Sequence, residues 1–179
     1  MTTSDYLLYT GLFVAILATQ LGTRRPDLKR LILPVAIVAG VGVKYLRDLP
    51  TGTTSHLLEA AGVAAGLAFG LAAVACIKTG KDPADGRLTT TAGWPYAATW
   101  IAALALRFGF AYGSTHWFAG PIDAFSRAHH VSAATYAAAF VLMVLTMITV
   151  RTAGVLLRGK AAGATIPAGN LRLARRFTA

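Results

Sequence analysis

Apolar and polar residues occur along this chain in long blocks. Five predominantly apolar runs are separated by polar segments that contain Gly, Pro and basic residues. Such runs are typical of membrane-crossing helices, because about 20 apolar residues span the hydrocarbon core of a bilayer. The runs predict spans near residues 6–22, 31–47, 56–77, 93–112 and 132–151. The expected fold class is all-α, a polytopic membrane helix bundle with five transmembrane helices.

The polar segments between the runs carry signals for helix ends and turns. Ser55 or Thr54 is expected to cap the third run, and Ser132 the fifth. The segment 78–91 is expected to be a polar loop, because its Asp-Pro and Asp-Gly pairs favour turns. Pro121 is expected to open a short helix on the membrane surface, between the fourth and fifth runs.

The composition excludes a soluble globular domain. The chain of 179 residues is 55% hydrophobic and 13% charged, whereas soluble domains contain about 25% charged residues. Its mean hydropathy is +0.57. Intrinsic disorder is excluded because it requires low hydrophobicity. A disulfide scaffold is excluded because Cys76 is the single cysteine of the sequence.

The formal net charge of +10 arises from basic residues that lie between the apolar runs. In a soluble protein this charge would indicate a nucleic-acid partner. Here it indicates topology, because Lys and Arg concentrate in cytoplasmic loops. With the N-terminus outside, 13 of the 17 basic residues fall in cytoplasmic segments. The exceptions are Lys44, Arg47, Arg107 and Arg127.

The sequence therefore predicts a multi-pass protein of a bacterial-type plasma (inner) membrane, with its N-terminus outside and its C-terminus in the cytoplasm. Residues 1–158 are expected to form a single transmembrane bundle, and residues 159–179 a basic cytoplasmic tail. Membrane lipids are the expected partners, since each basic residue near an anionic leaflet contributes about 1 kcal/mol to binding. No nucleic-acid partner is expected.

The third run contains the small-residue stripe Gly62, Gly66 and Gly70, a tandem GxxxG pattern. In lipid, small residues at this spacing let two helix backbones approach closely. Glu59 falls on roughly the same stripe by helical spacing. Two interpretations stay open, which are tight packing within one bundle and a homodimer interface.

Three charged residues lie inside the runs, each a few residues from the outer end of a different helix: Lys44, Glu59 and Arg107. Charges at membrane depth are costly and face partners or water-filled cavities. They predict an outward-opening polar pocket in which Glu59 and Arg107 pair or share a cavity. The same ligand-binding pocket is expected to include Asp48, Trp100, His116, His129 and His130. For Lys44, snorkelling to the head groups is the simpler interpretation.

All four histidines also fall on the expected outer side: His56, His116, His129 and His130. Proton transfer, metal ligation and axial haem ligation are functional interpretations, and anchoring in the head-group layer is the structural one. No metal-ligand set is identified, because the adjacent His129 and His130 diverge by about 100° in a helix. Haem and metal ions stay open as cofactors. The candidate acid–base groups are Glu59, His56, His116, Asp123 and Arg107. His56 and Glu59 are three residues apart, so they are expected to be neighbours on one helix face.

Several features between Arg24 and Arg107 resemble the CcdC-like family of small bacterial integral membrane proteins. They are Arg24-Arg25-Pro26 before a Leu/Pro run, Gly66 and Gly70 in the third run, Asp85-Gly86 in the following loop, and Trp100 followed by Arg107. The resemblance covers about half of the chain. It implies an inner-membrane protein associated with cytochrome c maturation or haem handling.

Two classes of function follow from these patterns. The first is a non-enzymatic accessory or transport factor that binds an apolar or amphipathic ligand at the outward-facing pocket. The second is a membrane-embedded enzyme that acts on a lipid or isoprenoid-like substrate through the outer Glu, His and Asp residues. Nucleotide-binding and soluble-hydrolase motifs are absent from the sequence, which leaves these two classes to be separated by the structure of the pocket.

Overall fold

The computed structural model describes residues 22–46 and 52–167, which form five helices and three short strands. The helices are α2 (Leu28–Leu46), α3 (Thr53–Cys76), α4 (Trp94–His116), α5 (Ala119–Ala128) and α6 (Ala133–Ala161). The strands are β1 (Gly22–Arg24), β2 (Ile77–Lys81) and β3 (Leu88–Ala92). The described part is therefore mainly helical, as expected, with a small sheet that was not expected.

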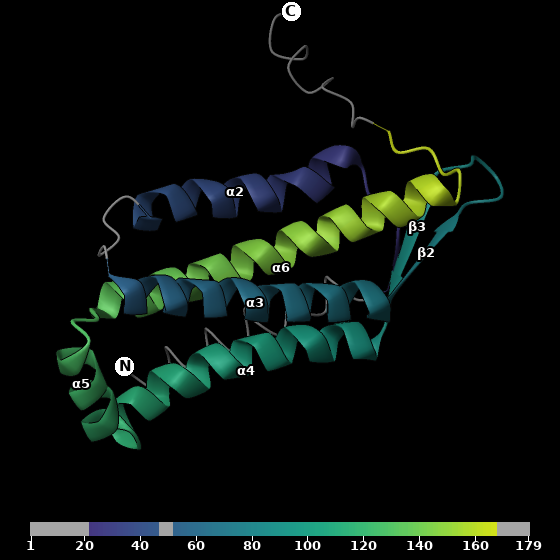
Figure 1. Cartoon of the computed structure of the whole chain (residues 1–179). Helices are drawn as coiled ribbons and strands as arrows, with labels where there is room; N and C mark the ends of the chain where they lie inside the picture. Colours follow the sequence, from purple (N-terminus) through teal and green to yellow (C-terminus); the bar gives the residue numbers. More distant parts are fainter. Residues whose placement is uncertain (1–21, 47–51, 168–179) are drawn as a thin grey trace, which may run out of the picture.

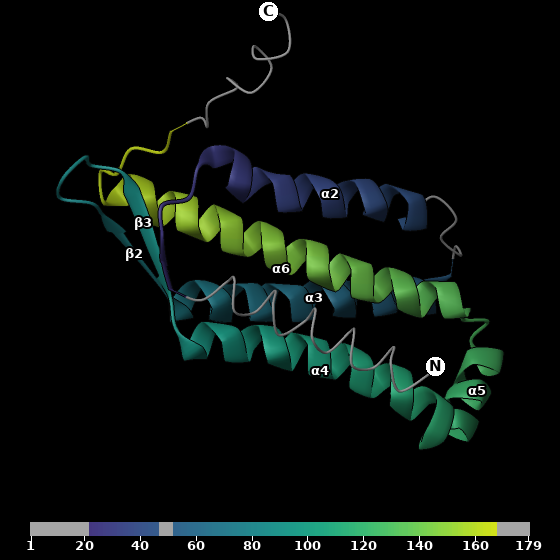
Figure 2. The ribbon, with the colours of Figure 1, turned by 180° about the vertical axis from the view of Figure 1, so that it is seen from behind.

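The four long helices lie side by side, with the strands at one end of the bundle and α5 at the other (Figures 1 and 2). We call these the sheet end and the α5 end. Helices α2 and α4 run from the sheet end to the α5 end, and α3 and α6 run in the opposite direction (Figure 1). The alternating direction that consecutive spans predict is thus present in the described helices.

Helices α3 and α6 form the most extensive contact, and the glycine stripe lies within it. A Cβ atom on Gly62 would overlap the carbonyl group of Ala139, and one on Gly66 would overlap that of Met143. At Gly70 a Cβ atom would lie 2.8 Å from the Cβ of Val150. The stripe therefore packs within one bundle, and α6 occupies the face that a homodimer through these glycines would use.

The segment expected to be a polar loop, 78–91, forms most of a β-hairpin. Strands β2 and β3 pair antiparallel from Ile77↔Ala92 to Lys81↔Leu88, and β1 pairs with the other edge of β3. The β-branched run of threonines in β3 favours extended backbone. The predicted Asp-Gly turn is present, with Gly86 at φ +71°. Beside the polar residues, Ile77, Leu88 and Ala92 are buried against the helices.

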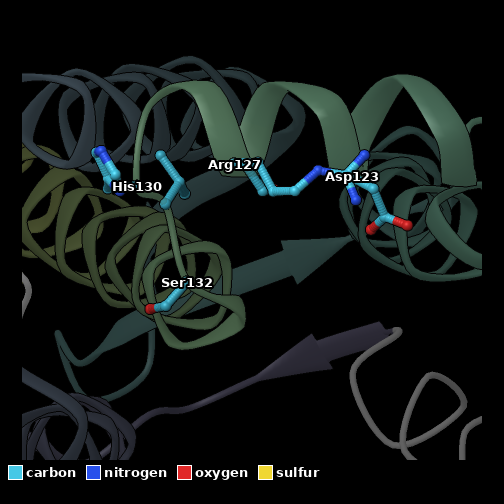
Figure 3. A pocket seen from close by; sticks show the side chains of 6 residues that line it. Asp123, Arg127, His130 and Ser132 are labelled. Carbon is cyan, nitrogen blue, oxygen red and sulfur yellow. The ribbon is translucent and has the colours of Figure 1, made fainter.

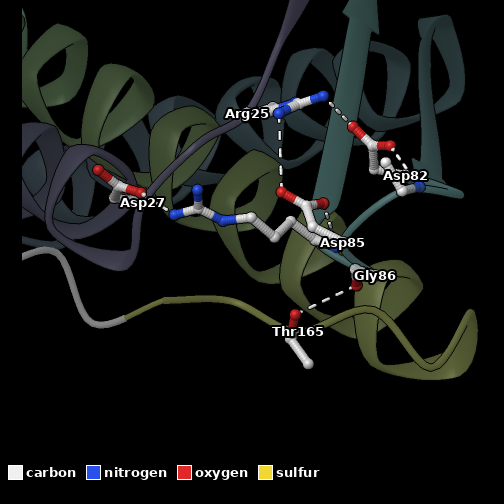
Figure 4. Close-up of polar contacts among 8 residues, drawn as sticks. Arg25, Asp27, Asp82, Asp85, Gly86 and Thr165 are labelled. Atoms are coloured by element: carbon white, nitrogen blue, oxygen red, sulfur yellow. Dashed lines mark hydrogen bonds and ion pairs between the residues drawn. The ribbon is translucent and has the colours of Figure 1, made fainter.

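Ion pairs join the hairpin to the segments around β1 (Figure 4). Arg25 pairs with Asp82 and lies 3.6 Å from Asp85, and Arg87 lies 3.5 Å from Asp27. The chain after α6 returns to the same place, where the backbone N–H of Leu88 donates to the carbonyl of Thr165. The domain boundary expected at residue 158 thus falls inside α6, and residues 162–167 pack at the sheet end. Residues 168–179 of the expected tail lie outside the described part.

Two of the described helices, α3 and α6, are long and apolar enough to cross a membrane. The spans expected near 31–47 and 93–112 correspond to α2 and α4, which do not meet the same criterion. Helix α2 carries three basic residues, and α4 is rich in Gly, Tyr and Trp. The span expected near 6–22 lies outside the described residues. The five-span expectation is therefore supported only in part.

The helix-end predictions have mixed outcomes. Ser132 caps α6, as predicted, and its hydroxyl accepts a hydrogen bond from the N–H of Thr135. The prediction for α3 is wrong, because Gly52 occupies the N-cap position without a side-chain hydrogen bond and Ser55 is buried inside the helix. The short helix predicted around Pro121 is present as α5.

Candidate functional site

The carboxyl group of Glu59, in the second turn of α3, lies partly buried at the α5 end. Its side chain is 14% exposed. One carboxyl oxygen, Oε2, lies 3.4 Å from Nδ1 of His56, so the predicted contact between these two residues is confirmed. The other oxygen, Oε1, is buried and has no hydrogen-bond partner. An unpaired buried acceptor is costly, by about 1–3 kcal/mol, so the Glu59 carboxyl group is the strongest candidate for ligand contact at this end.

The predicted ion pair between Glu59 and Arg107 is not formed. Arg107 is exposed on α4, and it makes no ion pair with any residue of the described part. Helix α4 diverges from α3 toward the α5 end (Figure 1). Equal depth on two helices therefore does not bring the two side chains together. The exposed position of Arg107 agrees with the snorkelling interpretation.

Three further members of the expected pocket have different outcomes in the structure. Lys44 lies in the last turn of α2, at the α5 end. Asp48 lies outside the described residues. Trp100 is in the second turn of α4, where it packs against the hydrophobic cluster at the sheet end. The prediction that Trp100 lines the outer pocket is therefore wrong, because it lies at the opposite end of the bundle from Glu59.

The remaining histidines make local contacts at the α5 end. His116 stacks on Tyr112 at a centroid distance of 4.1 Å, and its Nδ1 lies 2.8 Å from the hydroxyl of Thr115. His129 lies against Phe125, at 4.6 Å between ring centroids. Both contacts involve residues of the same helix or its cap, so neither histidine approaches Glu59 through them.

The segment from α5 to α6 surrounds an open depression (Figure 3). Its lining residues are Asp123, Ser126, Arg127, His130, Val131 and Ser132. The hydroxyl of Ser126 lies 3.1 Å from that of Tyr136, which ties α5 to α6. The depression includes two of the predicted site residues, Asp123 and His130. Glu59 is not among its lining residues, so these side chains do not form one acid–base set.

No three His, Cys, Asp or Glu residues within 22–46 and 52–167 lie close enough together to hold a metal ion. The predicted outer site therefore reduces, in the described part, to the pair of His56 and Glu59. An imidazole beside a carboxylate can hold and transfer a proton. The unpartnered carboxyl oxygen can accept a hydrogen bond or a cation from a bound molecule.

A second polar cluster lies at the sheet end and was not predicted. Tyr96 of α4 is 1% exposed. The ring of Trp100 lies edge-on to it, at 6.4 Å between centroids, and Cζ of Arg151 lies over it at 5.6 Å from the centroid. Three polar atoms of this cluster are buried without a hydrogen-bond partner: Tyr96 Oη, Trp100 Nε1 and Arg151 Nε.

This donor cluster is energetically unusual for a protein interior. Each buried donor without a partner costs about 1–3 kcal/mol, and native structures contain few such groups. The contact between the Arg151 guanidinium and the Tyr96 ring offsets part of the cost, by about 0.5–2 kcal/mol. The sequence did carry one signal, since Tyr96 and Trp100 are four residues apart and share a helix face. Arg151, however, follows directly after the fifth apolar run, where a basic residue is interpreted as flanking a membrane span.

Comparisons with known proteins do not add to this description. No protein-family model matches the chain. No curated protein and no solved structure matches it either.

Proposed function

We propose that this protein is a multi-pass membrane protein in which α2, α3, α4 and α6 all cross the bilayer. The direction of the helices supports this. Gly62 lies on Ala139 and Val74 lies on Gly154, so α3 and α6 run parallel. Two parallel spans require the chain between them to return across the membrane. Helix α4 is the element that makes this return, although its hydropathy is lower than that of α3 and α6.

Aromatic residues at both ends of α4 support the same assignment. Trp94 is 74% exposed at the sheet end, and Tyr112 and Trp117 are exposed at the α5 end. Trp and Tyr concentrate at membrane interfaces. Trp94 and Tyr112 are separated by about 27 Å along the helix axis, close to the hydrocarbon thickness of about 30 Å. Between them, Leu106 and Phe108 are exposed, as expected for side chains in lipid.

The sheet end corresponds to the cytoplasmic side in this proposal. The basic residues around β1, in the hairpin and at the end of α6 lie there, and α5 lies on the outer side. The segment 6–22 supplies a fifth span with the N-terminus outside, and the membrane is of the bacterial plasma-membrane type. Such an assignment satisfies the rule that Lys and Arg concentrate in cytoplasmic segments.

The protein acts, in this proposal, as a small accessory or transport factor that binds an apolar or amphipathic ligand near the outer surface. The main support for this proposal is that the Oε1 atom of Glu59, in an apolar helix, is buried without a hydrogen-bond partner. Ionisable groups inside membrane helices are costly and usually serve substrates, ions or protons. A ligand with a hydroxyl, amine or amide group would supply the hydrogen-bond donor that this oxygen lacks.

Replacement of Glu59 tests this function directly. Wild-type protein, Glu59→Gln and the control Asp123→Asn, an exposed carboxylate at the same end, would be purified in parallel. Bound molecules would then be measured by native mass spectrometry of the detergent-solubilised proteins. We expect Glu59→Gln to lose the bound ligand and Asp123→Asn to retain it. Equal ligand content in all three proteins would contradict the proposal.

The resemblance to the CcdC-like family suggests haem as one ligand to test. The absorption spectrum of the purified protein would then contain a Soret band that weakens in Glu59→Gln or His56→Ala. A colourless protein that still binds a lipid would exclude haem handling and retain the accessory role.

A membrane-embedded enzyme acting on a lipid or isoprenoid-like substrate is the second candidate. The contact of 3.4 Å between His56 and Glu59 favours it, because a carboxylate can orient an imidazole for general acid–base chemistry. The other candidate catalytic residues, His116, Asp123 and Arg107, make no contact with this pair among the hydrogen bonds and ion pairs of the described residues. Conversion of a bound lipid, abolished in His56→Ala, would distinguish an enzyme from a binding factor.

A further inference from the structure

The donor cluster of Tyr96, Trp100 and Arg151 lies at the opposite end of the bundle from Glu59 and has no place in the function proposed above. Its three buried atoms all belong to hydrogen-bond donors. The indole N–H and the guanidinium N–H can only donate, and the tyrosine hydroxyl can donate. The rings of Tyr96 and Trp100 lie 6.4 Å apart between centroids, and Cζ of Arg151 lies 5.6 Å from the Tyr96 centroid. A single group that satisfied all three donors would have to offer several acceptors.

We propose that Tyr96, Trp100 and Arg151 form a binding site for a phosphate group. The phosphate is either the head group of a membrane lipid or a free anion. A phosphate offers several acceptor oxygens and a negative charge that complements the guanidinium. A single buried water has two acceptor lone pairs and no charge, so it cannot serve three donors equally well.

No carboxylate of the described residues serves as an ion-pair partner for this cluster. Among the described residues at the sheet end, Asp27, Asp82 and Asp85 each pair with an arginine around β1 or the hairpin. Arg151 forms no ion pair within the described part. Within the described part no carboxylate pairs with Arg151, and a bound anion would supply the missing charge.

The depth of the cluster fits a lipid head group. Tyr96 and Trp100 are the third and seventh residues of α4, so their Cα atoms lie about 3 Å and 9 Å from its start. Trp94, exposed at the start of α4, marks the membrane interface. Trp100 and Arg151 are only partly buried, so the cluster lies at the edge of the core. Exposed basic residues at this end, Lys78, Lys81 and Lys160, would gather anions near it.

Thermal unfolding of the full-length protein in an uncharged detergent tests the site. The protein would be titrated with a short-chain phosphatidylglycerol, with a galactosyl diacylglycerol of equal chain length, and with inorganic phosphate. We expect a saturable rise of Tm with phosphatidylglycerol and none with the galactolipid. A similar rise with inorganic phosphate would identify the ligand as a free anion. No rise with either phosphate compound would overturn the proposal.

Two variants locate the effect. Tyr96→Phe removes one hydroxyl group and keeps the ring that packs in the core, and Arg151→Gln removes the charge. Each loses a hydrogen bond to a charged group, so the apparent affinity should fall about tenfold or more. The matched control Tyr112→Phe, at the other end of α4, should bind as the wild type does.

The stability of Tyr96→Phe without ligand gives an independent readout. Because the hydroxyl is unpartnered in the absence of ligand, its removal should leave the Tm unchanged or raise it. The same variant should show a reduced gain of Tm with the phosphate ligand. Wild-type affinity in both Tyr96→Phe and Arg151→Gln would overturn the site. If Arg151→Gln does not fold, wild-type affinity in Tyr96→Phe alone would overturn the site. The test does not depend on Glu59, so it is separate from the test of the proposed function.

Discussion

At the residue scale, the contact between α3 and α6 depends on positions where a side chain has no room. Gly62 and Gly66 face backbone carbonyl groups of α6, which cannot move aside without shifting the whole helix. On the other helix, Gly154 faces the side chain of Val74. Small residues on both partners therefore allow an approach that side-chain interdigitation alone would prevent.

Gly66→Ala tests this close approach. The added methyl group would overlap the Met143 carbonyl, so we expect a loss of about 1–3 kcal/mol in unfolding free energy, as for overpacked cores. Denaturant-induced unfolding followed by circular dichroism measures it. Gly109→Ala is the matched control, because Gly109 lies in α4 with nothing within 4 Å of a Cβ atom. Equal stability of the two variants would show that α3 and α6 are not in close contact at Gly66.

The same scale shows which site residues the sequence can identify. The contact of His56 with Glu59 follows from spacing within one helix, so it was predicted. The pairing of Glu59 with Arg107 depends on the angle between two helices, which depth along each helix does not determine. The donor cluster combines α4 with α6 across 50 residues of chain and was missed for the same reason.

At the element scale, the predicted apolar runs correspond well to helices, because burial and lipid exposure both require apolar residues over many turns. The sheet was missed because its strands are short and polar. In β3, Thr89 and Thr91 alternate with buried neighbours such as Thr90, and this period of two extends over only five residues. The Asp85-Gly86 turn was recognised, but the strands on either side of it were assigned to a loop.

Burial, more than ion pairing, is expected to hold the hairpin on the bundle. Leu88 is 1% exposed and lies against Gly159 of α6, so Leu88→Ala should cost about 2–5 kcal/mol. Arg25 is largely exposed in its ion pairs with Asp82 and Asp85, so Arg25→Gln should cost at most about 1 kcal/mol. Unfolding free energies of both variants, measured at low and high salt, check this. A larger loss for Arg25→Gln would show that the ion pairs dominate.

At the scale of the whole molecule, the proposed number of membrane crossings depends on the parallel course of α3 and α6. Helix α3 ends at the sheet end, and α6 begins at the α5 end (Figure 2). The segment that joins them must therefore travel the full length of the bundle. A protein in which only α3 and α6 entered the membrane would leave α4 beside them without a lipid or protein environment for its exposed Ile101, Leu106 and Phe108.

This geometry predicts that the hairpin turn and α5 lie on opposite sides of the membrane. Single cysteines would be introduced by Ala84→Cys, in the turn, and Ala124→Cys, in α5, on a Cys76→Ser background; both alanines are exposed. A membrane-impermeant maleimide added to intact cells should label Ala124→Cys, and should label Ala84→Cys only after permeabilisation. The Cys76→Ser protein without a new cysteine is the labelling control. Labelling of Ala84→Cys in intact cells would reverse the orientation. Equal labelling of both positions would contradict the crossing of α4, because the two ends of one spanning helix cannot lie on the same side.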